Sequence, residues 1–243
     1  MNLVVDVGNT QIKFAVFKGD ELIEKSATHL ENAVESLQKI LESYPKLSKA
    51  IISSTSEVTA NFENLLTDYV DLLEFTHHSK VNFINDYKTP ETLGLDRMAL
   101  VAAAAYLYPS QNVLVIDAGT CITYDFINET SVYLGGAISP GLQMRYKAMH
   151  TFTKKLPLVK ETFQSSTYIG KSTKEAMQIG VCKSISYEID GYIEDYLADY
   201  EDLTVVLTGG DYKLLSASIK NSIFATSNFL LKGLNKILQL NSN

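Results

Sequence analysis

One pattern occurs twice in this chain, as VVDVGNTQIKFAVF at residues 4–17 and as VIDAGTCITYDFI at residues 115–127. Each copy begins with an apolar strand that leads into an aspartate, Asp6 in the first copy and Asp117 in the second. A Gly-containing turn with Thr follows, and apolar and polar residues then alternate, as is typical of a β-hairpin. Two matched hairpins indicate an internal duplication, which predicts two domains of similar topology that face each other.

The segments after each hairpin carry the patterns of an α/β protein. After the first hairpin, we expect strands at 21–26 and 50–54 and helices at 32–41, 60–69 and 97–108. After the second hairpin, we expect strands at 132–137 and 204–208 and helices within 172–197 and at 227–238. The duplication predicts domain boundaries of 1–110 and 111–243, because the pattern restarts just after residues 109–111.

Composition and charge narrow the function classes. The 243 residues include 21 Lys and Arg against 28 Asp and Glu, which gives a net charge of −7. An acidic chain without a basic run repels phosphate backbones, so we expect no nucleic-acid partner, although a local basic pocket for a small anion remains compatible with this charge.

Two further features concern the compartment. Cys121 and Cys182 have no CxxC spacing, which favours buried thiols in a reducing compartment over a disulfide framework. The N-terminus meets Asp6 after three apolar residues and does not resemble a signal peptide. The longest apolar run, 98–108, is far shorter than the roughly 20 residues of a membrane span. We therefore predict a cytoplasmic protein with no membrane partner.

The two Asp–Gly–Thr turns suit phosphate chemistry. Such a turn exposes successive backbone N–H groups, and its small residues let a phosphate approach closely. Thr10 and Thr120 add hydroxyl donors, and Lys13 adds a positive charge. Asp6 and Asp117, at the strand ends, can hold a cation that neutralises a polyphosphate. This pattern predicts that the two turns clamp a nucleotide in a cleft between the domains; the alternative is a pair of ordinary hairpin turns.

Two competing motifs do not fit. Gly170–Thr173 resembles the end of a P-loop, but that pattern requires Gly where this chain has Ser165, and no apolar strand precedes it. The four histidines have no zinc-ligand spacing; they are His29, His77, His78 and His150.

Asp96 opens the alanine-rich helix and has two possible roles. As the N-cap it would accept a backbone N–H of the first turn. As a catalytic carboxylate it would accept the proton of a substrate hydroxyl, while Arg97 orients an anionic group. The segment Gly135–Gly141 is expected as a Gly/Pro-rich turn that either lines the cleft floor or only reverses the chain.

Taken together, these motifs resemble type III pantothenate kinases of the acetate-and-sugar-kinase/heat-shock-ATPase/actin superfamily. The resemblance covers essentially the whole chain. It rests on the order and spacing of DVGNTQIK (6–13), Tyr87, GLDR (94–97), DAGT (117–120), GGAISPG (135–141), TGGD (208–211) and LLKGLNKIL (230–238).

The resemblance implies a fold, an activity and a set of roles. The fold would be α/β with duplicated actin-like (ribonuclease H-like) domains, each a mixed sheet flanked by helices. The activity would be phosphorylation of pantothenate to 4′-phosphopantothenate with ATP, the first step of coenzyme A biosynthesis. The implied ATP contacts are Asp6, Val7, Gly8, Asn9, Thr10, Gln11, Ile12, Lys13 and Thr120. The implied pantothenate contacts are Tyr87, Gly94, Leu95, Asp96, Arg97 and Thr173, with Asp96 as the proton acceptor.

The resemblance also implies cofactors and a partner. Asp117 would bind a monovalent cation, potassium or ammonium, and Mg²⁺ would accompany ATP. A homodimer is implied, with the pantothenate site near the interface. The threonine that corresponds to Thr173 usually follows Asn, whereas Ser172 precedes it in this chain.

Two other interpretations remain. A kinase or phosphohydrolase of the same fold that acts on a sugar or carboxylate would share the duplicated turns, but not Tyr87 with the GLDR segment. The other interpretation is a non-catalytic regulator, because some relatives carry the name of a virulence accessory factor. A regulator of this kind would be expected to have lost the catalytic groups. Asp6, Asp96 and Asp117 are all present.

Overall fold

The chain folds into two compact units. The computed structural model describes residues 1–8, 11–54, 59–160 and 167–242. One unit comprises Met1–Pro109 with Asn228–Asn243, and the other comprises Ser110–Ser227. Among the described helices, none combines the length and the apolar character needed to cross a membrane.

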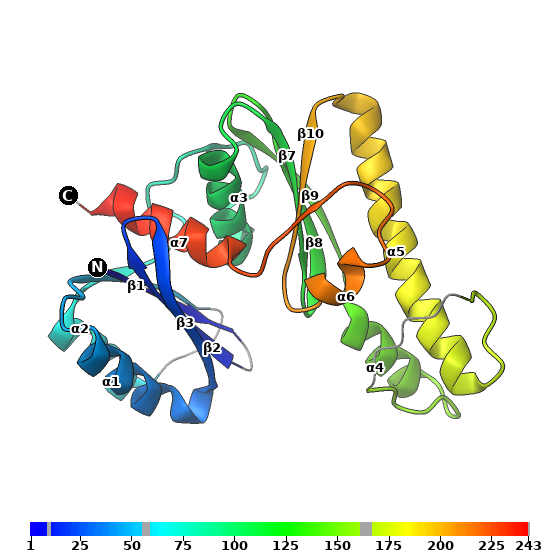
Figure 1. Cartoon of the computed structure of the whole chain (residues 1–243), viewed down its shortest axis with the longest axis horizontal. Coiled ribbons are helices and arrows are strands. Elements are labelled where there is room, and N and C mark those ends of the chain that lie inside the picture. The colour runs from blue at the N-terminus through cyan, green and yellow to red at the C-terminus, as the bar shows by residue number, and fades with distance from the viewer. Residues whose placement is uncertain (9–10, 55–58, 161–166, 243) are drawn as a thin grey trace. The chain divides into compact units, whose positions relative to one another are not determined.

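A five-stranded mixed sheet forms the centre of the first unit (Figure 1). Its strand order is β3-β2-β1-β4-β5. The strands are β1 (Asn2–Val7), β2 (Gln11–Lys18), β3 (Glu21–His29), β4 (Lys49–Ser54) and β5 (Asp71–Glu74). β1, β2 and β3 are antiparallel neighbours, whereas β4 runs parallel to both β1 and β5. The expected hairpin and the strand near residue 50 are confirmed.

Helices cover both faces of this sheet (Figure 1). On one face, α1 (Ala33–Ser43) and α2 (Ala60–Tyr69) bury apolar side chains of alternate strand positions, such as Leu3 and Val5. On the other face, α7 (Phe229–Asn241) contacts β1 and β4 and packs along α3 (Leu95–Leu107). Short elements complete the unit: the 3₁₀ turns η1 (Leu30–Asn32) and η2 (Pro90–Thr92) and the strand β6 (Ile84–Asn85).

The position of α7 differs from the expected domain boundaries. We expected residues 111–243 to form one domain, yet Asn228–Asn243 group with the first unit. The physical reason is a close helix contact: a side chain at Gly233 would collide with the backbone carbonyl of Ala99 on α3. Glycine lets the two helices approach closely, a long-range fit that the local pattern does not reveal.

The second unit repeats the strand arrangement of the first. Its strands are β7 (Asn112–Ala118), β8 (Cys121–Ile127), β9 (Val132–Pro140), β10 (Leu203–Thr208) and β11 (Phe224–Ala225). Their order is β11-β10-β7-β8-β9. As in the first sheet, three strands are antiparallel neighbours, and the central strand pairs in parallel with the next one. The duplication predicted from the sequence is confirmed.

Three helices accompany this sheet. α4 (Leu142–Phe152) and the long α5 (Thr173–Asp199) bury apolar residues against β7, β8 and β10, and the short α6 (Tyr212–Ser216) adds Leu215. Figure 1 shows α5 running along one face of the sheet.

The expected turn at Gly135–Gly141 is wrong. Residues up to Pro140 continue β9, and α4 begins directly after Gly141. Gly135 has a φ of 109°, beside a register irregularity between β8 and β9, and a side chain at Gly136 would collide with the carbonyl of Tyr124. The glycines therefore serve a bulge and a close strand contact rather than a chain reversal.

Candidate active site

The first turn joins β1 to β2 and carries an ion pair. The amide of Gly8 donates to the carbonyl of Gln11 at 3.0 Å. Asp6 and Lys13 are cross-strand partners, and the Lys13 Nζ atom lies 3.1 Å from Asp6 Oδ2. Lys13 is half-exposed, so its amino group can also face an anion. Asn9 and Thr10, both expected to contact ATP, lie outside the described residues.

The residues beside this turn fall into two groups, those with buried side chains and those with exposed side chains. Val7 and Ile12 are buried among the apolar residues that pack under α1 and α2. Their side chains are therefore part of the core, and only their backbone groups can reach a ligand. Gln11 and Lys13 are exposed, as the alternation along β2 requires.

The second turn joins β7 to β8 and is enclosed by two glycines. The amide of Gly119 donates to the carbonyl of Cys121 at 2.9 Å, closing the turn as Gly8 does in the first unit. A side chain at Gly209, which has a φ of 97°, would collide with Asp117 and with the Ala118 carbonyl. A side chain at Gly141 would collide with the carbonyls of the turn. Backbone therefore approaches the turn from two sides.

A cavity of about 450 Å³ opens beside this second turn. Its lining residues are Gly119, Thr120, Gln143, Met144, Lys147, Gly210 and Asp211. Thr120 was expected to contact ATP, and in the structure it lines a cavity formed by residues of its own unit. Burial raises the pKa of the Asp211 carboxyl.

Three of these lining residues, Gln143, Met144 and Lys147, escaped the sequence analysis. They lie on one side of α4, and the available signal was their spacing, since Met144 and Lys147 follow Gln143 by one and four residues.

Asp96 is not the N-cap of its helix. The N-cap of α3 is Gly94, whose carbonyl accepts the Met98 amide, so Asp96 is the second helical residue. Asp96 Oδ1 accepts the Arg97 amide at 2.8 Å. A side chain at Gly94 would collide with this carboxylate in its present position. The partly buried carboxylate is thus held at the helix start.

Arg97 and Tyr87, expected to contact the substrate together, are neighbours. The guanidinium carbon of Arg97 lies 5.6 Å from the centre of the Tyr87 ring, a cation–π distance. The Arg97 side chain is 5% exposed, so its charge lies in a low-dielectric environment where an anion would be strongly attracted. Gly94, Leu95 and Asp96 precede it in the same segment.

Thr173 lies in the second unit, as the exposed first residue of α5. Ser172 is the N-cap, and its Oγ accepts the Glu175 amide at 3.2 Å. Glu175 Oε2 in turn accepts the Lys171 amide at 2.8 Å. Ser and Asn are comparable N-caps, so Ser172 supports the start of α5 as the usual Asn can.

The residues around Asp117 suit a hard cation. Asp117 is the cross-strand partner of Thr123, so the two side chains lie on one face of the sheet. The Thr123 Oγ1 atom is buried and has no hydrogen-bond partner among the described residues. A carboxylate beside an unused hydroxyl oxygen is an oxygen donor set of the kind that hard cations accept. Across the described ranges, no group of three or more His, Cys, Asp or Glu residues is placed to hold a metal ion.

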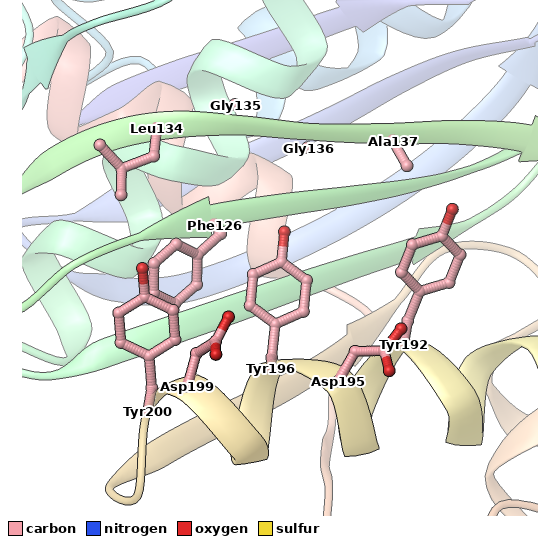
Figure 2. Close-up of a pocket in the computed structure, with 10 residues that line it drawn as sticks. All are labelled: Phe126, Leu134, Gly135, Gly136, Ala137, Tyr192, Asp195, Tyr196, Asp199 and Tyr200. Atoms are coloured by element: carbon pink, nitrogen blue, oxygen red, sulfur yellow. The ribbon is translucent and has the colours of Figure 1, made fainter.

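A second cavity, of about 420 Å³, lies between α5 and the strands β8 and β9 (Figure 2). Tyr192 and Tyr196 of α5, and Tyr200 directly after it, project toward Phe126 and the strand that carries Gly135. Its lining contains other residues than those expected to bind ATP or pantothenate.

Comparison with known proteins shows which proteins this chain resembles in sequence and in fold. The profile of the type III pantothenate kinase family matches residues 2–195. A type III pantothenate kinase of Christiangramia forsetii is 48% identical over 241 residues, which are 99% of each chain. Among solved structures, a conserved Baf-family protein of Campylobacter jejuni is 23% identical with a TM-score of 0.62, covering 98% of this chain and 97% of that one. A protein of Listeria monocytogenes named as a candidate N-acetylmannosamine kinase has a TM-score of 0.51 at 11% identity, covering 98% of each chain.

The duplicated mixed sheets, each with an Asp–Gly turn between its first two strands, define an α/β protein of the actin-like fold. The two solved structures support the fold alone. The profile match and the near-full-length identity go further: this chain belongs to the type III pantothenate kinase family.

Proposed function

We infer that the chain transfers the γ-phosphoryl group of ATP to pantothenate and so forms 4′-phosphopantothenate, the first step of coenzyme A biosynthesis. The observation that carries this inference is family membership, with 48% identity to a type III pantothenate kinase over nearly the whole chain. ATP and pantothenate are its substrates, and a divalent metal accompanies the nucleotide.

We propose both Asp–Gly turns as ATP-binding elements. In the first unit, the exposed amino group of Lys13 supports phosphate binding, and Asp6 beside it supports charge balance with Mg²⁺. Mg²⁺ usually takes one or two carboxylates and completes its shell with water and phosphate oxygens, which here would neutralise the transferred group. In the second unit, Thr120 and the cavity with Lys147 offer a hydroxyl, a cation and space for part of the nucleotide.

Asp96 is the proposed proton acceptor. The hydroxyl oxygen of pantothenate forms a bond to the γ-phosphorus in line with the bond that breaks, ADP leaves with that electron pair, and the hydroxyl proton passes to the Asp96 carboxylate. Arg97, at cation–π distance from the Tyr87 ring, orients the carboxylate of pantothenate. Gly94 and Leu95 border this site, and Thr173 is a further proposed contact.

The test of the activity is a panel of acceptors. With ATP and Mg²⁺, coupled measurement of ADP formation should give turnover with pantothenate and at most background with glucose, N-acetylmannosamine and acetate. Turnover with a sugar but not with pantothenate would replace this function by the sugar-kinase alternative.

A monovalent cation, potassium or ammonium, is proposed at Asp117. The support is the carboxylate beside the unused hydroxyl oxygen of Thr123. Replacing potassium by sodium should lower kcat, because the smaller ion fits a site for potassium poorly. Asp117→Asn should reduce activity at least about tenfold and abolish the difference between the two ions, since one carboxylate–cation interaction at a shielded site contributes more than about 1.4 kcal/mol. Equal wild-type activity in both salts would contradict this site.

A homodimer and a cytoplasmic location complete the proposal. The family resemblance supports the homodimer, and light scattering of the purified protein would measure twice the chain mass. The cytoplasmic location is supported by the use of ATP and by two cysteines without a disulfide between them.

A further inference from the structure

The last residues of β9 lie against the second Asp–Gly turn. Cys121 and Ile122, which follow the turn, pair with Pro140 and Ser139 of β9. The Gly141 amide donates to the carbonyl of Thr120 at 3.1 Å, and Gly141 has no room for a side chain. The position of Thr120 is therefore coupled to the backbone of Ser139–Gly141.

One side chain, that of Arg145, donates hydrogen bonds to the last residues of β9. Arg145, in the first turn of α4, donates from Nε to the Pro140 carbonyl at 2.8 Å and from Nη2 to Ser139 Oγ at 2.9 Å. Its Nη1 atom also donates to Ser184 Oγ at 3.3 Å. The planar guanidinium thus binds two consecutive residues of β9 and a residue of α5, a geometry that a lysine cannot reproduce.

Glu188 on α5 holds the guanidinium in place. Arg145 Nη2 lies 2.5 Å from Glu188 Oε2, and both side chains are about four-fifths buried, with exposures of 18% and 23%. The other oxygen, Oε1, accepts the hydroxyl of the buried Tyr124 at 2.8 Å. Burial alone would raise the pKa of Glu188, but hydrogen bonds from Arg145, Ser139 and Tyr124 lower it further than burial raises it. The glutamate is thus charged, and its two oxygens join α4 to β8.

We propose that Arg145 and Glu188 are positioning residues for ATP binding: the pair holds Ser139–Gly141, and through it the Gly119–Thr120 turn and the adjoining cavity, in the geometry that receives the nucleotide. The proposal rests on the proposed role of that turn in ATP binding. Neither residue lines the cavity itself, so both act through the backbone that they hold.

The test compares ATP affinity with pantothenate affinity. Arg145→Ala should weaken ATP binding about tenfold in calorimetry, because the backbone that positions the turn loses a largely buried charged partner. Arg145→Lys keeps the positive charge but loses the planar guanidinium with its several donors. Its ATP affinity should therefore lie between that of Arg145→Ala and that of the wild type. The KM for pantothenate should change less than about twofold, a split that general loss of stability would not produce.

Two variants serve as controls. Ile185→Val removes one carbon from the core face of α5 without touching the pair, and Lys39→Ala breaks an exposed ion pair with Glu35 in the first unit. Both should bind ATP as the wild type does. If Arg145→Ala does not fold, Glu188→Gln is measured instead, since it keeps the shape and removes the charge, and it should weaken ATP binding severalfold.

Unchanged ATP affinity in the folded Arg145→Ala or Glu188→Gln variant would overturn the proposal. An equal loss of ATP and pantothenate affinity would overturn it as well. Calorimetry with ATP requires no turnover, so the proposal is tested even if the wild type binds ATP and leaves pantothenate unchanged. That last result would refute only the proposed function.

Discussion

The Asp96 carboxylate depends on its nearest neighbours for its position. It accepts the Arg97 amide at 2.8 Å, and the missing side chain of Gly94 leaves the space that it occupies. The spacing alone left Asp96 as either an N-cap or a catalytic carboxylate, and the backbone makes Gly94 the cap of this helix.

Asp96→Asn should remove the proposed proton acceptor while it keeps the shape of the side chain. We expect kcat to fall by about two to four orders of magnitude, the usual contribution of a general base, with unchanged ATP affinity and melting temperature. Steady-state kinetics and calorimetry measure these effects. The control is Asp86→Asn, at an exposed position outside the proposed site, which should keep full activity. A folded Asp96→Asn enzyme with near-normal kcat would remove Asp96 from its assigned role.

Some helices and strands could be predicted correctly from sequence patterns alone. The helix expected at 60–69 matches α2, Ala60–Tyr69, and both hairpins occur where the alternation predicted them. These elements have strong local periodicity and defined turn residues. The short strand β5 and helix α4 carried weaker patterns and were not expected, and Gly135–Gly141 was misjudged because a bulge and a turn use the same residues.

The turn between β8 and β9 contains a strained residue. Ser131 has a φ of 60°, a left-handed conformation that costs a non-glycine residue energy. Ser131→Gly should therefore raise the free energy of unfolding by about 0.5–1 kcal/mol, after the larger chain entropy of glycine is subtracted. Urea denaturation measures the change. The same substitution in a helix, Ser216→Gly in α6, should lower stability, and a loss of stability in both variants would contradict the strain.

Contacts across the first unit link distant parts of the chain. Asp20, at the tip between β2 and β3, accepts the Tyr106 hydroxyl at 2.6 Å and the Gln239 amide at 3.0 Å. Asn235 of α7 donates to the carbonyl of Gly19 in the same tip. These contacts explain why the last helix belongs to the first unit, and they could not be predicted from local sequence because over 200 residues separate the partners.

Asp20 makes this linkage sensitive to acid. Hydrogen bonds from Tyr106 and Gln239 lower the pKa of Asp20 in the folded protein. The contribution of the ionised Asp20 to the free energy of unfolding is therefore complete above the ordinary Asp pKa of about 4. This contribution is lost as the pH falls through the lower pKa of the folded protein. Because Asp20 is exposed, we expect less than about 1 kcal/mol. Urea midpoints between pH 7 and pH 3 should depend less steeply on pH in Asp20→Asn and Tyr106→Phe. Slopes equal to that of the wild type in both variants would contradict the linkage.

The molecule as a whole is a duplicated fold that carries a kinase site, and the identity of its product tests this account most directly. The measurement is mass spectrometry of pantothenate after incubation with the purified protein, ATP, Mg²⁺ and potassium, with fragmentation to locate the added group. We predict one added phosphoryl group on the primary hydroxyl, and none without ATP. Unmodified pantothenate, with ATP binding intact, would contradict it.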